Sequence, residues 1–181
     1  MAGAQLQVAV PGQEPPAGED PATMVPTVPE LHPLAIVADW YGSYLHPAGE
    51  PAAGPGGGVP SPFDPEAFEV LDQLLTGPLL EAVRQAMGTE AGVLGTIGFD
   101  PWVNGQDFDL GGVTLKAEPP AAGEAQQCRV IAEVENFGAV SRVTFDFLQG
   151  TDGRWRLAEV HGKGPGDDGD SWQLGELLDQ P

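Results

Sequence analysis

An alternation of apolar and polar residues over 128–160 most constrains how this chain can fold. It has the period of two that marks a β-strand with one buried and one solvent-facing side. Asn136-Phe137-Gly138 and Thr151-Asp152-Gly153 interrupt it, and such short links join neighbouring antiparallel strands. We therefore predict an antiparallel sheet with one wet face, built from strands over 113–117, 128–135, 143–147 and 155–160.

The first half of the chain has the spacing of helices instead. Apolar residues recur at intervals of three and four over 30–46, 64–75 and 79–87. Asp64-Pro65-Glu66 is a typical helix start, and Phe68 is expected to face inward from the helix that follows. Helices followed by a meander predict an α+β domain, with N-terminal helices packed on a curved antiparallel sheet of about four strands. A sheet curled around helices would form a cone with one open mouth, where ligands commonly bind.

Proline and glycine divide the chain into segments. Most of the 19 prolines precede residue 66. We predict a disordered or extended leader over 1–29 and one α+β domain over 30–162. Residues 47–62 are expected to form a flexible loop insertion, because a Gly/Pro run of this length is unusual inside a compact domain. Residues 163–181 are predicted to be an acidic tail with a short C-terminal helix.

The charge balance limits the possible partners. The chain has 27 acidic residues against 7 basic ones, a formal net charge of -20. Binding of nucleic acid or of an anionic lipid surface needs clustered Lys and Arg, so neither is expected. The acidity is compatible with plain solubility or with attraction to a basic partner. No apolar run approaches the ~20 residues of a membrane-spanning helix, so membrane insertion by this chain is not expected.

Residues 99–109, between the helical and the strand-rich half, combine carboxylates, a carboxamide, a proline and a tryptophan. Asp and Asn oxygens could bind Ca²⁺, although the spacing is not that of an EF-hand loop. A turn is the favoured interpretation: Asp100 caps it, Asn104-Gly105 is left-handed, and Asp107 accepts backbone N–H groups. Trp102 is expected to plug the base of the cone. The candidate ligand- or partner-binding residues of this segment are Asp100, Trp102, Asn104, Gln106, Asp107 and Asp109.

Neither a metal site nor a cofactor is predicted. His32, His46 and His161 are scattered and lack a ligand spacing such as His-x-x-x-His, so surface or helix-end roles are favoured for them. Cys128 lies in a strand pattern and is interpreted as a small buried thiol. It has no nearby group that would lower its pKa and make it a nucleophile.

No catalytic constellation is predicted either. An isomerase or dehydratase with this architecture would need an Asp or His beside Tyr or Asp donors. Asp39 and Tyr41 lie on different faces of their helix, and Asp146 points away from the inward face of its strand. The residues that could line the mouth of the cone are Tyr41, Tyr44, Trp155 and His161.

Several short motifs together resemble a known family. In chain order they are Tyr41-Gly42-Ser43-Tyr44-Leu45, Leu74-Leu75-Thr76, Asp100-Pro101-Trp102, Gln106-Asp107-Phe108-Asp109, Val134-Glu135-Asn136-Phe137-Gly138, Val143-Thr144-Phe145-Asp146-Phe147 and Gly153-Arg154-Trp155-Arg156-Leu157. Over about residues 31–161 they resemble the bacterial envelope family catalogued as domain of unknown function 3828. The resemblance implies the cystatin-like cone fold of nuclear transport factor 2, scytalone dehydratase and ketosteroid isomerase. It also implies an exported or lipid-anchored protein without an established activity.

Acidity without a catalytic constellation favours a non-enzymatic binding or accessory module that recognises a protein or peptide partner, with a basic partner as the sharper expectation. The periplasm or cell envelope is the expected location, with a signal or lipid anchor removed from the N-terminus; the cytoplasm is the alternative. The alternative function is a small-molecule binder, or an isomerase- or dehydratase-like enzyme, that uses the cone cavity.

Overall fold

The computed structural model describes residues 5–7, 31–45, 59–107, 109–118, 126–166 and 168–179. The predicted leader, apart from residues 5–7, lies outside the described residues, as do His46 and the predicted loop up to residue 58. Within the described ranges, no helix combines the length and the apolar character that crossing a membrane would require.

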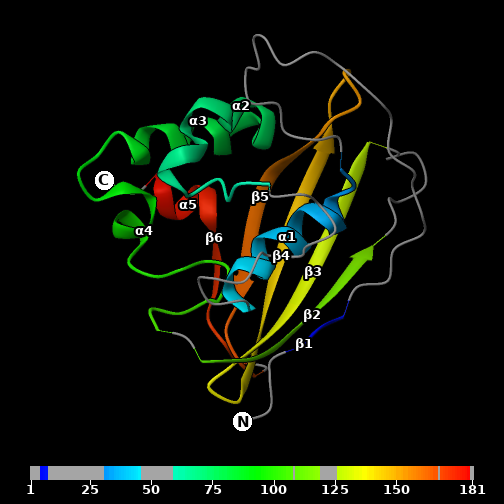
Figure 1. The fold of residues 1–181 in the computed structure, drawn as a ribbon. Coiled ribbons are helices and arrows are strands. Elements are labelled where there is room, and N and C mark those ends of the chain that lie inside the picture. Colours follow the sequence, from blue (N-terminus) through cyan, green and yellow to red (C-terminus); the bar gives the residue numbers. More distant parts are fainter. Residues whose placement is uncertain are drawn as a thin grey trace.

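A six-stranded sheet in the order β1-β2-β3-β4-β5-β6 forms the centre of the structure (Figure 1). Strands β2 to β6 pair antiparallel, and β1 adds a short parallel edge beside β2. The α+β class is therefore confirmed, and the four long strands are those that the alternation predicted. The strands are β1 (Gln5–Gln7), β2 (Leu110–Glu118), β3 (Gln127–Asn136), β4 (Ala139–Gln149), β5 (Trp155–Lys163) and β6 (Ser171–Gln173).

On β3 and β4, every second side chain from Cys128 to Val134 and from Ser141 to Phe147 is buried. On β4, Val143, Phe145 and Phe147 are buried, whereas Arg142 and Asp146 belong to the opposite face. Burial of three such side chains stabilises the fold by about 1.5–3 kcal/mol each relative to exposure. The prediction that Asp146 points away from the core is confirmed.

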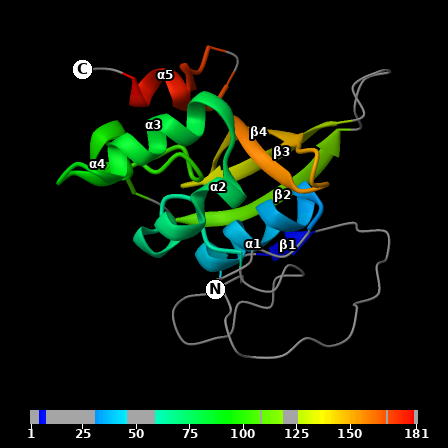
Figure 2. The same ribbon diagram turned by 90° about the horizontal axis from the view of Figure 1, so that it is seen from above.

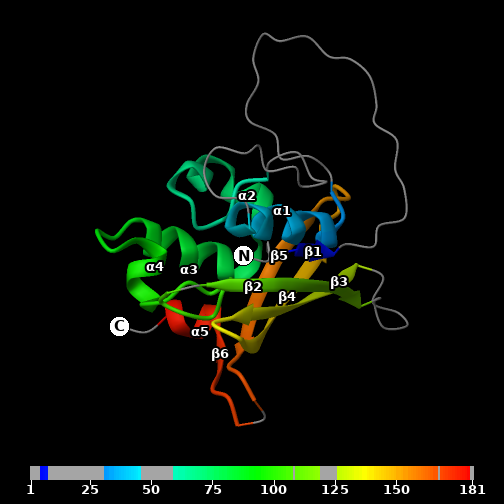
Figure 3. The same ribbon diagram turned by 60° about the horizontal axis from the view of Figure 1, so that its bottom comes forward.

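The helices gather on one side of this sheet, and Figures 2 and 3 show α3, α4 and α5 grouped together beside it. Helix α1 packs on β2 and β3, while α2 and α3 pack on β5, and both α4 and α5 contact α3. The helices are α1 (Pro33–Leu45), the 3₁₀ helix η1 (Pro65–Val70), α2 (Leu71–Leu74), α3 (Gly77–Met87), α4 (Gly92–Ile97) and α5 (Leu174–Leu178).

Helix α1 is buried on both sides, because the chain returns over it after residue 58. The indole N–H of Trp40 donates to the Pro60 carbonyl at 3.0 Å, and the Val59 N–H donates to the Asp39 carboxylate at 3.1 Å. All residues of 33–42 are buried as a result. The end of the predicted 47–62 loop is therefore packed against the helix rather than free.

Three details differ from the sequence prediction. Phe68 is 53% exposed, because the first part of its helix is 3₁₀, and three residues per turn bring Ala67 and Val70 inward instead. Helix α4 was not predicted, since two of its six residues are glycines and Gly98 follows it. The predicted short C-terminal helix is present as α5, but the packed domain continues past the predicted boundary at residue 162, because β6 pairs with β5 and α5 packs on α3.

Candidate functional site

The turn at residues 100–105 is closed by its own backbone. The Asp100 N–H donates to the Gly105 carbonyl at 2.9 Å, and the Gly105 N–H donates to the Asp100 carbonyl at 3.3 Å. The Trp102 N–H donates to Oδ1 of Asp100 at 2.9 Å, and Asn104 has a left-handed φ of 52°. An Asp that binds the backbone two residues on, followed by a left-handed Asn, is the turn chemistry that the sequence predicted.

Two tyrosines of α1 tie this turn to the core. The Tyr44 hydroxyl donates to Oδ2 of Asp100 at 2.7 Å, and the Tyr41 hydroxyl donates to the Trp102 carbonyl at 2.7 Å. Burial raises the pKa of Asp100, although hydrogen bonds from Tyr44 and from the backbone of Trp102 and Val103 act in the opposite direction. Burial, followed by the charge of Asp100, raises the pKa of Tyr44 far above its usual range. Tyr44 is therefore held as a neutral donor to a carboxylate whose two oxygens are both engaged.

Trp102 is fully buried and lies in a stack of aromatic rings. Its ring centroid is 5.2 Å from that of Trp40, 4.6 Å from Phe63 and 5.0 Å from Phe145. Its indole N–H donates to the Ser61 hydroxyl at 3.2 Å. Aromatic pairs at these separations stabilise a core beyond the area that they bury. The stack packs α1 against the sheet, since Trp40 belongs to α1 and Phe145 to β4.

Asn104 joins the turn to the C-terminal part of the sheet. Its Oδ1 accepts a hydrogen bond from the indole N–H of Trp172 at 2.6 Å. The Trp172 ring also meets Phe99 edge-on, with centroids 5.2 Å apart. Asn104 therefore acts as a structural acceptor in this arrangement.

The second half of the segment behaves differently, because Gln106, Asp107 and Asp109 are exposed. Asn136 at the end of β3 holds the backbone there: its Nδ2 donates to the Asp107 carbonyl at 3.1 Å, and its Oδ1 accepts the Asp109 N–H at 2.8 Å. The Phe137 N–H then donates to the Asp109 carbonyl at 3.0 Å. The sequence predicted a turn at Asn136, but not the hydrogen bonds from the Asn136 side chain to the backbone of Asp107 and Asp109.

We call the exposed residues around this contact the tip patch: Asp107, Asp109, Glu135, Phe137 and Val140. Phe137 and Val140 are 65% and 55% exposed. None of the three carboxylates is in an ion pair within the part of the chain that the structure describes. The signal for this patch was in the sequence, since a phenylalanine occupies a hairpin turn where Asn or Gly is usual.

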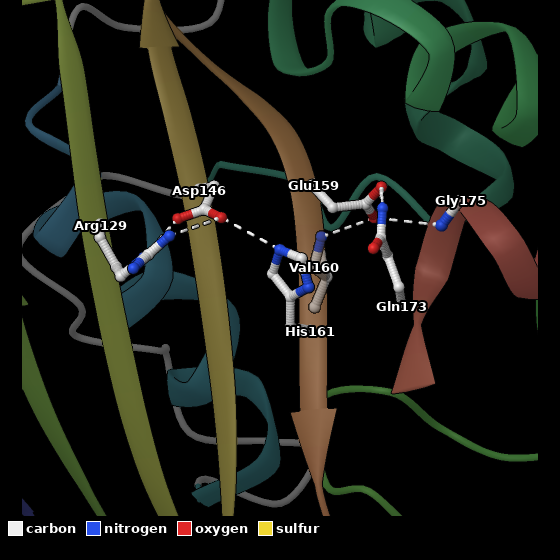
Figure 4. A network of polar contacts seen from close by, with 7 residues as sticks. All are labelled: Arg129, Asp146, Glu159, Val160, His161, Gln173 and Gly175. Carbon is white, nitrogen blue, oxygen red and sulfur yellow. Dashed lines mark hydrogen bonds and ion pairs between the residues drawn. The ribbon is translucent and has the colours of Figure 1, made fainter. Parts of the chain in front are cut away.

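A polar network crosses the solvent-facing side of the sheet (Figure 4). Asp146 on β4 accepts two bonds from the Arg129 guanidinium, at 2.6 and 3.2 Å, and lies 3.0 Å from Nε2 of His161 on β5. Glu159 on the same strand accepts the Gly175 N–H at 3.0 Å and a bond from Gln173 at 2.8 Å, and so caps the start of α5.

The network places His161 on the outer face of the sheet, so it does not reach the helix-covered side on which a mouth was expected. The reason is the register of β5, which pairs His161 with Thr144 and puts both on the face of Asp146. Trp155 is half-buried, and its ring lies 6.4 Å from that of His32 in an edge contact. Of the four proposed mouth residues, only Tyr41 and Tyr44 have rings in contact with each other, at 6.3 Å.

The described residues contain no group of three or more His, Cys, Asp or Glu side chains placed to hold a metal ion. Asp100, the first ligand of the calcium alternative, has both oxygens bound by protein donors. Cys128 is buried, and burial raises the pKa of its thiol.

Comparisons of the chain with models of protein families, with curated proteins and with solved structures give no match.

Proposed function

We propose that this chain is a non-enzymatic binding module for a positively charged protein or peptide. One observation carries the proposal: most of the few basic side chains are already engaged by the chain's own carboxylates. The ion pairs are Arg84–Glu81, Arg129–Asp146, Arg142–Glu133 and Arg156–Asp152. With 27 acidic residues against 7 basic ones, most carboxylates have no cation of their own, so the surface field favours a basic partner.

The packed interior supports a binding role at the surface. Trp40, Trp102 and Phe145 are buried against one another, with ring centroids 5.0–6.1 Å apart. Apolar ligand sites need an open volume, and rings at these distances leave none between them. The polar groups of the 100–105 turn also support binding at the surface, because they form hydrogen bonds with one another and with the tyrosines of α1.

The test is capture of the partner from the source cells, followed by its affinity for the chain at increasing salt. An unrelated acidic protein of the same net charge serves as the control for non-specific attraction. We expect specific binding that weakens steeply with salt, because exposed charges are screened over about 10 Å at 0.1 M. An affinity that is indifferent to salt would overturn the electrostatic basis of the proposal.

The resemblance noted above motivates two further parts of this proposal. We propose that the sheet curves around α1 as a cone of the nuclear transport factor 2 kind, and that the protein acts in the bacterial periplasm or envelope. Solution scattering of the purified chain tests the shape, and fractionation of cells that express the full reading frame tests the location. Recovery only in the cytoplasmic fraction would exclude the envelope.

A second candidate function rests on Tyr44 and Asp100. A half-buried carboxyl group with a raised pKa beside a tyrosine donor is a combination that acid–base enzymes use. The neutral apolar dye Nile red probes the site, with Trp102→Ala as a positive control that opens a cavity. We expect dye binding by that variant alone. Dye binding by the wild-type chain that Tyr44→Phe alters would favour the small-molecule function instead.

A further inference from the structure

The tip patch combines exposed apolar surface with unpaired negative charge. Phe137 and Val140 are three positions apart on one hairpin and are the two most exposed of its large apolar side chains. Val140 pairs with Glu135 across the hairpin, and directly opposed residues have neighbouring side chains. Apolar residues gathered at one exposed place, with a polar rim, are typical of a protein interaction site.

The backbone conformation of Phe137 is strained, and this strain lowers the stability of the fold. The link between β3 and β4 is two residues long, and both have positive φ, 50° at Phe137 and 74° at Gly138. Asn or Gly adopts this conformation easily, whereas a bulky side chain is strained in it. The exposed ring offers little packing to offset the strain. A residue that breaks a local rule without benefit to the fold is expected at a functional position.

The charges beside Phe137 identify the kind of partner group. Asn136 fixes the backbone of Asp107 and Asp109 next to the turn, and Glu135 lies opposite Val140 on the hairpin. An arginine side chain satisfies both parts of such a surface, because its guanidinium stacks on an aromatic face and pairs with carboxylates in a planar fork. A lysine supplies the same charge without the planar, stacking group.

We infer that the tip patch is the docking surface for an arginine-bearing segment of the partner, with the guanidinium stacked on Phe137 and paired with the surrounding carboxylates. This inference rests on the proposed function and specifies its site and its recognition chemistry. The occupant is a peptide segment, because the patch is the exposed end of one hairpin and the segment bound beside it, and its separate charged and apolar groups suit individual side chains.

The experiment measures the binding of two synthetic peptides of equal length and charge, one alternating Gly and Arg and the other alternating Gly and Lys, to the full chain at low salt. We expect the arginine peptide to bind about two- to fivefold more tightly, the range of an exposed cation–π contact. Phe137→Leu should remove that difference while it keeps an apolar side chain at the turn.

A matched pair of charge variants locates the binding. Neutralisation of Asp107, Asp109 and Glu135 to their amides should weaken the arginine peptide about tenfold. The control neutralises three exposed carboxylates on the helical part of the chain, away from the hairpin end, in Glu69, Asp72 and Glu90, and should change the affinity far less. Circular dichroism of each variant confirms that it is folded.

Each other outcome overturns the inference in a distinct way. Equal affinities for both peptides, with sensitivity to the tip charges, would overturn the arginine specificity and leave the proposed function standing. Equal losses in the two charge variants would place the binding elsewhere on the acidic surface. Failure of both peptides to bind at low salt would overturn the inference, while the salt-dependent capture experiment tests the proposed function separately.

Discussion

The Tyr44 hydroxyl donates a 2.7 Å hydrogen bond to Oδ2 of Asp100, and this contact ties the end of α1 to a turn 56 residues further along the chain. The other oxygen of Asp100 holds the turn itself, through the Trp102 N–H. One carboxylate therefore fixes both the shape of the turn and its position on the helix. Neither residue suggested the other in the sequence, where they lie in separate motifs.

Tyr44→Phe should lower the free energy of unfolding by about 1–3 kcal/mol, because it leaves a half-buried carboxylate oxygen without its donor. Urea unfolding at neutral pH measures the loss. Ser43→Ala is the matched control on the same helix, since its hydroxyl bonds only to the Trp40 carbonyl three residues back and is exposed. Equal stability of Tyr44→Phe and wild type would show that the hydrogen bond contributes nothing.

Asp100 and Asp152 should give opposite pH dependences. Burial raises the pKa of Asp100, so its contribution to stability is present below its ordinary value of 3.8 and is lost as pH rises through the raised pKa. Hydrogen bonds from Arg156 lower the pKa of Asp152, so its contribution is present above 3.8 and is lost as the solution becomes acidic.

The comparison uses Asp100→Asn and Asp152→Asn, each measured against wild type by urea unfolding between acidic and neutral pH. The advantage of wild type over Asp100→Asn should shrink as pH rises, and its advantage over Asp152→Asn should shrink as pH falls. Taking differences removes most of the effect of the overall negative charge, since each variant differs from wild type by a single charge. Slopes of the same sign would contradict the assignment.

Gly162→Ala should detach β6 from its place. A Cβ at Gly162 would collide with the indole of Trp172, which lies over this glycine and donates to Asn104. Overpacking of this kind costs about 1–3 kcal/mol, and a displaced Trp172 also loses its hydrogen bond. Urea unfolding measures the loss of stability, and NMR should show a shift of the Trp172 indole N–H resonance. Gly164→Ala is the control, because its Cβ would meet only ordinary contacts, the nearest at 3.4 Å, and it should leave both measurements nearly unchanged.

Phe137→Asn should stabilise the isolated chain by about 1 kcal/mol, because Asn tolerates the left-handed conformation that strains a phenylalanine. Thermal and urea unfolding measure the gain, with Val140→Thr as an exposed control on the same hairpin. A loss of stability instead would mean that the Phe137 ring contributes packing to the hairpin, and the reason for expecting a role in binding would disappear.

The long strands could be predicted because their signal is local. Val143, Phe145 and Phe147 alternate with polar residues, and one buried face is enough to dictate both the period and the register of β4. The left-handed turn at Asn104 could be predicted for the same reason, since its chemistry resides in adjacent residues. Helix α4 could not, because its glycines are unfavourable in isolation and packing against α3 and α5 overrides that preference.

The roles of the individual residues in the 99–109 segment could not be predicted from the sequence. The sequence identified the segment but could not divide it into a buried half, held by Tyr41 and Tyr44, and an exposed half, held by Asn136. Likewise the periodicity placed Asp146 on the outer face, but its partners Arg129 and His161 come from two other strands.

The sequence by itself determined the class of the fold, the course of the long strands and the negative charge, since all three follow from composition and from short-range periodicity. Only the tertiary structure decided which polar groups satisfy one another and which remain exposed. The physical reason is that hydrogen-bond partners here are distant in the chain, and their meeting depends on how helices and strands pack rather than on any local preference.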